Sequence, residues 1–91
     1  MGQLEDMHVF IRVVETGSIT KAAEQMDIAK SAVSKRLASL EHRLGIKLIN
    51  RTTRMSSITE AGQQYYQRSK LILDEVDELN SQTSSSKRAL E

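Results

Sequence analysis

Basic side chains gather in one stretch of this 91-residue chain, from Lys30 to Arg54. This basic stretch holds seven lysine and arginine residues against one acid and nets +6, whereas the residues before it net −3 and those after it −2. Ammonium and guanidinium groups at this density attract the phosphates of a nucleic acid. The net charge of +1 therefore hides a strongly polarised chain whose positive part suits a polyanion.

Small polar and basic side chains share one face of a helix that the apolar spacing predicts over residues 30–44. Val33, Leu37, Leu40 and Leu44 form its inner stripe, and the opposite, polar face carries Lys30, Ser31, Ser34, Lys35 and Ala38. A face this short and rich in donors fits a helix that enters a major groove and contacts base edges. A solvated face that happens to carry lysines is the alternative. The neighbouring elements favour the nucleic-acid interpretation.

Residues 46–59 alternate apolar and polar side chains at both ends of a polar, basic centre at residues 50–54. This pattern predicts two short antiparallel strands with a basic tip, the wing of a winged helix-turn-helix. Arg51 and Arg54 at such a tip reach the sugar-phosphate backbone or a narrow minor groove, whose negative potential attracts arginine. An ordinary surface loop is the alternative.

Two further helices must position this surface. A core-facing stripe at spacings of three and four predicts a helix from about Gln3 to Thr16; its residues are Leu4, Met7, Phe10, Ile11 and Val14. Gly17 suits its C-terminal cap and Ser18 the N-terminal cap of a short helix over residues 19–26. A tight turn at residues 27–29 then leads into the basic stretch, which completes a helix-turn-helix order.

The last predicted helix begins near Thr59, with Ser57 as an alternative cap, and runs to about Asn80. Its apolar residues follow a coiled-coil-like spacing that suits a second copy of the chain: Tyr65, Ile72, Val76 and Leu79. Packing against the first helix of the same chain is the alternative, and both contacts can hold on different faces. Residues 81–91 are expected to be a frayed helix end or a linker tail.

The chain lacks the residues that several classes of protein need for their function. The chain has no cysteine, its His8 and His42 lie on different predicted helices, and it has no glycine-rich phosphate loop, so we expect no enzyme, metal site or cofactor. Phe10, Tyr65 and Tyr66 are its only aromatic residues and fall on core or dimer faces, which disfavours stacking on single-stranded RNA. With no membrane span or signal peptide, the chain is expected to be soluble and cytoplasmic. A protein–protein interaction module without DNA affinity is the main alternative function.

Five ordered motifs resemble the N-terminal domain of LysR-type transcriptional regulators, over about Leu4 to Leu79. They are Gly17-Ser18-Ile19-Thr20-x-Ala22-Ala23, Ser31-Ala32-Val33-Ser34, Leu40-Glu41-x-x-Leu44-Gly45, Leu48-x-Asn50-Arg51-Thr52-x-Arg54 and Ile58-Thr59-Glu60-Ala61-Gly62. The resemblance implies a mainly α fold, a winged helix-turn-helix of three helices and a short two-stranded wing over residues 1–58. A linker and dimerisation helix would follow over residues 59–80.

The resemblance also implies a bacterial, nucleoid-associated regulator that binds an imperfect inverted repeat of double-stranded DNA. It would bind as a homodimer through its last helix, and a tetramer is expected in the full-length protein. A small-molecule inducer would bind only through a larger C-terminal domain that is missing from this chain.

Site roles follow from the same resemblance, motif by motif. The major groove would be contacted by Lys30, Ser31, Ser34 and Lys35. Phosphate would be contacted by Ser18 and Thr20. The sugar-phosphate backbone would be lined by Arg51, Thr52 and Thr53, and Arg54 would enter the minor groove. The chain departs from the family pattern at three positions. Lys30 replaces the usual glutamine, which puts the preferred base in doubt; Ala29 replaces a serine cap, at a cost of ~1 kcal/mol; and Ile49 replaces a phenylalanine that packs.

Overall fold

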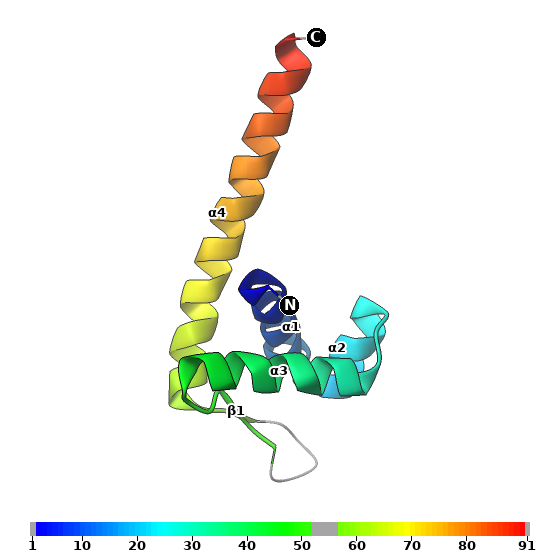
Figure 1. The fold of residues 1–91 in the computed structure, drawn as a ribbon, viewed down its shortest axis with the longest axis vertical. Coiled ribbons are helices and arrows are strands. Elements are labelled where there is room, and N and C mark those ends of the chain that lie inside the picture. The colour runs from blue at the N-terminus through cyan, green and yellow to red at the C-terminus, as the bar shows by residue number, and fades with distance from the viewer. Residues whose placement is uncertain (1, 52–56, 91) are drawn as a thin grey trace.

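A computed structural model of the chain describes residues 2–51 and 57–90. The elements follow the order α1 (Gln3–Thr16), α2 (Ile19–Met26), α3 (Lys30–Leu44), β1 (Ile49–Asn50), β2 (Ser57–Ile58) and α4 (Glu60–Leu90). The first three helices and the strand pair form a head at one end of the molecule, and α4 projects away from it (Figure 1). The principal extents of 54 × 26 × 21 Å reflect this projecting helix. The predicted winged helix-turn-helix with a long final helix is confirmed.

The helix boundaries follow from local capping. Gly17 adopts a left-handed backbone with φ 71° and donates its N–H to the Val13 carbonyl at 2.8 Å. Ser18 then accepts the N–H of Lys21 at 3.2 Å through its Oγ, as an N-terminal cap of α2. The cap at the start of α3, Ala29, supplies no such side-chain hydrogen bond, as expected for alanine.

The turn between α2 and α3 is tight because Asp27 adopts a left-handed conformation, with φ 56°. Among the described residues it is the one non-glycine with a positive φ, a region that Asp and Asn tolerate better than most side chains. The N–H of Ile28 reaches back to the Ala23 carbonyl at 3.1 Å and closes the turn. Ile28 itself packs, partly buried, against the core.

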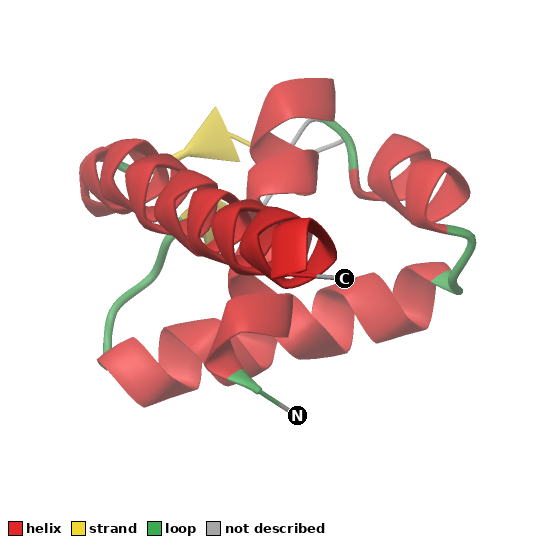
Figure 2. Cartoon of the chain, turned by 90° about the horizontal axis from the view of Figure 1, so that it is seen from above, coloured by secondary structure: helices red, strands yellow, loops and turns green. Residues whose placement is uncertain are grey.

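The core lies where α1 meets the other three helices (Figure 2). Its buried apolar residues are Met7, Val9, Phe10, Val13, Ala22, Ala23, Val33, Leu37, Leu40, Leu48, Ile49 and Leu73. The predicted inner stripe of α3 is confirmed, with Leu44 only partly buried. On α1 the prediction missed Val9 and Val13 and wrongly included Leu4, which is 46% exposed. Because α1 contacts three helices on different sides, its buried surface is wider than one stripe.

Helix α4 is held to α1 by a polar cluster beside the core. The hydroxyl of Tyr66 donates to the Glu15 carboxylate at 3.0 Å, and the Lys70 ammonium lies 3.5 Å from the same oxygen. Tyr66 and, after it, Glu15 raise the pKa of Lys70 above its ordinary value, because both favour the charged ammonium. These exposed contacts link α4 to the C-terminal part of α1.

The far end of α4 differs from the prediction, because the helix continues to Leu90 rather than ending near Asn80. The polar run after residue 80 contains no glycine or proline, and Ser, Thr and Gln are only weakly unfavourable in a helix. Nothing in that sequence therefore terminates the helix. The division of the chain at residues 58 and 80 remains a prediction.

Candidate nucleic-acid interface

The polar face of α3 is open to solvent. Lys30, Ser31, Lys35 and Ala38 are exposed and Ser34 is partly buried. On the opposite side of the helix, Val33, Leu37 and Leu40 are each no more than 1% exposed. Burial of that stripe fixes the rotation of α3 about its own axis, so the donor-bearing side chains must point away from the head.

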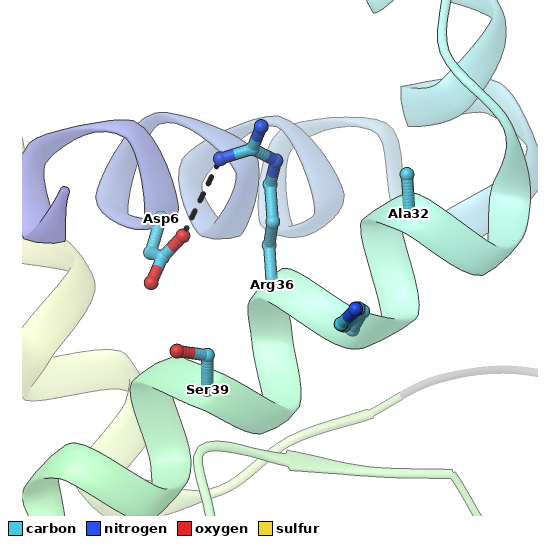
Figure 3. Close-up of a pocket in the computed structure, with 5 residues that line it drawn as sticks. Asp6, Ala32, Arg36 and Ser39 are labelled. Atoms are coloured by element: carbon cyan, nitrogen blue, oxygen red, sulfur yellow. Dashed lines mark ion pairs between the residues drawn. The ribbon is translucent and has the colours of Figure 1, made fainter. Parts of the chain in front are cut away.

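One arginine of α3 does not belong to the open face. Arg36 extends toward α1, where its Nη1 lies 3.6 Å from Asp6 Oδ1 (Figure 3). The same nitrogen lies 3.0 Å from Glu5 Oε2. Asp6 is fully buried, and neither of its carboxylate oxygens has a hydrogen-bond partner in the described part of the chain. Arg36 therefore balances a buried charge, and its sequence neighbour Lys35 carries the outward charge. The sequence did not signal this division.

The predicted phosphate contacts on α2 are at its first turn. Thr20 is exposed, and it lines a surface depression together with Lys30 and with Ala23 of α2. Ser18 is partly buried and already accepts the N–H of Lys21, although its hydroxyl hydrogen is not used by that bond. The structure thus brings Thr20 of α2 and Lys30 of α3 to one surface.

The strand pair of the wing follows directly after α3 (Figure 1). β1 and β2 are antiparallel, with Ile49 opposite Ile58 and Asn50 opposite Ser57. Ile49 is buried, and Asn50 and Arg51 are exposed. The predicted contacts Thr52, Thr53 and Arg54 lie outside the described residues. Arg51 is therefore the one predicted wing contact within residues 2–51 and 57–90.

Glu41, the lone acid of the basic stretch, joins the end of α3 to the wing. Its Oε2 accepts the N–H groups of Leu48 at 2.8 Å and Ile49 at 3.1 Å, and its Oε1 lies 3.2 Å from Arg51 Nη2. Its side chain is 12% exposed. Sequence reasoning gave Glu41 no role. An acid alone among seven basic residues was the signal available.

The Leu48–Ile49 peptide connects three elements. Its N–H donates to Glu41, while its carbonyl accepts the N–H of Thr59 at 3.0 Å, at the start of α4. Thr59 is the N-terminal cap of α4, because its Oγ1 accepts the N–H of Gly62 at 2.9 Å. A Cβ on Gly62 would lie 2.2 Å from the Leu48 carbonyl oxygen, so this close approach requires glycine.

The predicted dimer residues of α4 divide into two groups. Tyr65 is partly buried against the ring of Phe10 in the same chain, and Val76 is also partly buried. Ile72 and Leu79 are 43% and 61% exposed, and the neighbouring Leu71 is 61% exposed. A groove between α1 and α4 is lined by Gln3, Leu4, Met7, Tyr65, Arg68, Ser69 and Ile72. Apolar surface thus remains open on α4 after the intrachain packing is complete.

No helix in the described ranges combines the length and the apolar character that crossing a bilayer requires.

The family profile and the related sequences all belong to helix-turn-helix regulatory proteins. Residues 4–63 match the profile of the bacterial regulatory helix-turn-helix proteins of the lysR family. The HTH-type transcriptional regulator CrgA of Neisseria meningitidis is 51% identical over 72 residues, which are 79% of this chain and 24% of CrgA. The HTH-type transcriptional activator AaeR of Escherichia coli is 44% identical over 82 residues, which are 90% of this chain and 26% of AaeR.

Among solved structures, the BenM DNA-binding domain in its complex with catB site 1 DNA is similar to this chain with a TM-score of 0.88. That pair is 36% identical, and the similarity covers 92% of this chain and 93% of the BenM domain. This chain spans about a quarter of the length of the curated relatives that it matches.

Proposed function

The chain belongs to the LysR family of bacterial regulatory helix-turn-helix proteins, and from this membership we propose that it binds double-stranded DNA sequence-specifically. In this proposal α3 enters the major groove and the wing lies at the minor groove. The observation that carries it is the open polar face of α3, whose rotation is fixed by the buried stripe on the other side. Ammonium and hydroxyl donors on such a face can reach base edges.

Lys30, Ser31, Ser34 and Lys35 are the proposed base-reading residues. Lys30 and Lys35 are long, exposed and free of ion pairs with the described residues, so their charge is available to a phosphate or to guanine acceptors. Ser31 and Ser34 keep the helix slim enough to approach the groove floor. A lysine at position 30 donates from a single ammonium group and favours guanine over adenine.

The proposed backbone contacts surround that helix. Ser18 caps α2 and Thr20 lies in its first turn, where backbone N–H groups also favour an anion. Arg51, Thr52 and Thr53 are proposed to line the sugar-phosphate backbone, with Arg54 in the minor groove. Contacts of this kind position the protein and supply salt-dependent affinity rather than sequence preference.

A homodimer through α4 is proposed as the binding unit, with an imperfect inverted repeat as its site. The exposed Leu71, Ile72 and Leu79 support it, because a soluble helix seldom leaves that much apolar surface without a partner. Helix α4 has 31 residues and is about 46 Å long. Its length suits a spacer between two heads on successive turns of the duplex. Tetramer formation and inducer sensing are proposed only for the full-length regulator.

The test is a salt-titrated binding assay on random duplex, followed by selection of preferred sites from a randomised pool. We expect binding to random duplex at low salt, a steep loss of affinity as salt rises, and recovery of related half-sites in inverted orientation. A labelled duplex that tumbles freely at low ionic strength with excess protein would contradict the proposal. It would also favour the alternative of a protein-only module.

A further inference from the structure

Glu41 places a negative charge in the basic stretch, beside Arg51 of the wing that is proposed to contact DNA. It is the one acid among residues 30–54, and it lies in the last turns of α3, the proposed recognition helix. A carboxylate at such a place repels phosphate through simple Coulomb interaction. Glu41 must therefore also make a favourable contribution to DNA binding that outweighs this repulsion.

The contacts of Glu41 identify that contribution. Three donors converge on its carboxylate: the N–H groups of Leu48 and Ile49 on Oε2, at 2.8 and 3.1 Å, and Arg51 Nη2 on Oε1, at 3.2 Å. Hydrogen bonds to an ionised acceptor are about twice as strong as neutral ones. With a side chain that is only 12% exposed, solvent screens these bonds little.

The three donors belong to consecutive parts of the wing. Leu48 and Ile49 are buried; Leu48 directly precedes β1, Ile49 begins it, and Arg51 follows its end. The carboxylate thus attaches the first strand to α3 and orients the arginine at the same time. Within residues 2–51 and 57–90 the guanidinium uses one nitrogen, and a guanidinium has five N–H donors in a fixed fork. The donors that contact no described residue can bind a phosphate from a fixed direction.

We propose that Glu41 is a positioning residue that holds the wing on the recognition helix and aims Arg51 at a DNA phosphate. This inference rests on the proposed function, since it needs duplex DNA as the partner. According to this proposal Glu41 strengthens DNA binding overall, although its negative charge by itself weakens it. An experiment can measure whether DNA affinity falls or rises when Glu41 is replaced.

The experiment compares Glu41→Gln and Glu41→Asp with the parent 91-residue chain on random duplex over a range of salt concentrations. The amide removes the charge, whereas the aspartate keeps the charge but is one methylene too short to serve all three donors. We expect both variants to bind more weakly, with the slope of log affinity against log salt reduced by about 0.9, the value for one lost phosphate contact. In an Arg51→Ala background, neither change should reduce the slope further.

Glu24→Gln is the matched control, because Glu24 is exposed on α2 and its carboxylate pairs with no described residue. It should bind random duplex at least as tightly as the parent chain. The positioning role is wrong if Glu41→Gln binds as tightly as the parent or tighter with an unchanged slope. Failure of the parent chain itself to bind duplex would instead overturn the proposed function.

Thermal melts and the amide resonances of Leu48 and Ile49 separate positioning from loss of fold. We expect Glu41→Asp to remain folded and to shift those two resonances, and Arg51→Ala to leave them in place because Glu41 still accepts both N–H groups. If neither Glu41 variant folds, Arg51→Ala decides. A slope lower by about 0.9 supports the proposal, and an unchanged slope overturns it.

Discussion

The ring of Tyr65 on α4 meets the ring of Phe10 on α1 edge to face, with centroids 5.7 Å apart and planes inclined by 62°. The pair closes the core at the point where the long helix leaves the head, and Phe10 is fully buried there. A residue predicted for the dimer seam thus contributes to the packing of its own chain.

We expect this pair to be energetically coupled. Leucine at either position keeps most of the apolar volume but removes the aromatic contact. A double-mutant cycle of Phe10→Leu and Tyr65→Leu, measured by urea unfolding, should give a coupling free energy of about 0.5–1.5 kcal/mol. Additive effects would show that the two rings are independent.

Gly62→Ala tests the close approach between α4 and the wing. The added Cβ would lie 2.2 Å from a backbone oxygen of Leu48 and 2.9 Å from the Ile58 side chain, so the start of α4 must shift. We expect a loss of about 1–3 kcal/mol in the free energy of unfolding, the usual range for overpacking. Gly2→Ala is the control, because a Cβ there meets nothing within 4 Å. Equal melting temperatures for the two variants would contradict this account.

The ion pair between Asp6 and Arg36 should be stabilising only as a pair. Arg36→Met leaves the fully buried Asp6 carboxylate without its cation, and we expect a loss on the order of 3 kcal/mol. Adding Asp6→Asn should recover most of that loss, because the buried group is then neutral. Glu5→Gln, which removes only the exposed partner, should change stability by less than about 1 kcal/mol. Chemical denaturation of the four proteins measures all three differences.

Lys35 should affect the choice of DNA sequence more than general affinity. Lys35→Ala and Ser34→Ala are expected to weaken the selected site by about 1–3 kcal/mol and to weaken random duplex less. Arg51→Ala should weaken both and flatten the salt dependence. Competition assays with selected and random duplex measure the difference. Equal losses on both duplexes for Lys35→Ala would assign it to phosphate rather than to a base.

Ile72→Glu should separate the proposed dimer into monomers. The substitution places a charge at an apolar position of α4 that is 43% exposed in the single chain and would be buried against a second copy. Sedimentation velocity should report the monomer mass for Ile72→Glu. The control Ile46→Glu changes another exposed isoleucine, which lies on the head, and should leave the parent mass unchanged. A dimer that persists in Ile72→Glu would rule out this seam.

The sequence predicted the features that depend on neighbours in the chain. Gly17 and Ser18 cap their helices through contacts within a few residues, so the residue types at these positions located that helix boundary. The roles of Asp6 and Glu41 were not predictable, because each acid acts on residues of another element. From the sequence alone, a carboxylate at position 6 is expected to face solvent. Its burial is explained only by Arg36, which the fold brings from α3 to Asp6.

The same limit explains the two differences on α1 and α4. The periodicity of α1 indicates one apolar stripe, but contact with three helices buries Val9 and Val13 and leaves Leu4 outside. The C-terminal end of α4 depends on whether the polar residues after Asn80 continue the helix that precedes them. Their composition does not decide this. The site predictions at Thr52, Thr53 and Arg54 remain predictions.

The Leu48–Ile49 peptide has a mechanical consequence. A peptide unit is planar, and in the trans form its N–H and C=O point in opposite directions, here toward Glu41 of α3 and Thr59 beside α4. The two groups cannot swivel independently. A rotation of α4 about its axis therefore acts, through this planar peptide and the side chain of Glu41, on α3, the helix that is proposed to face DNA.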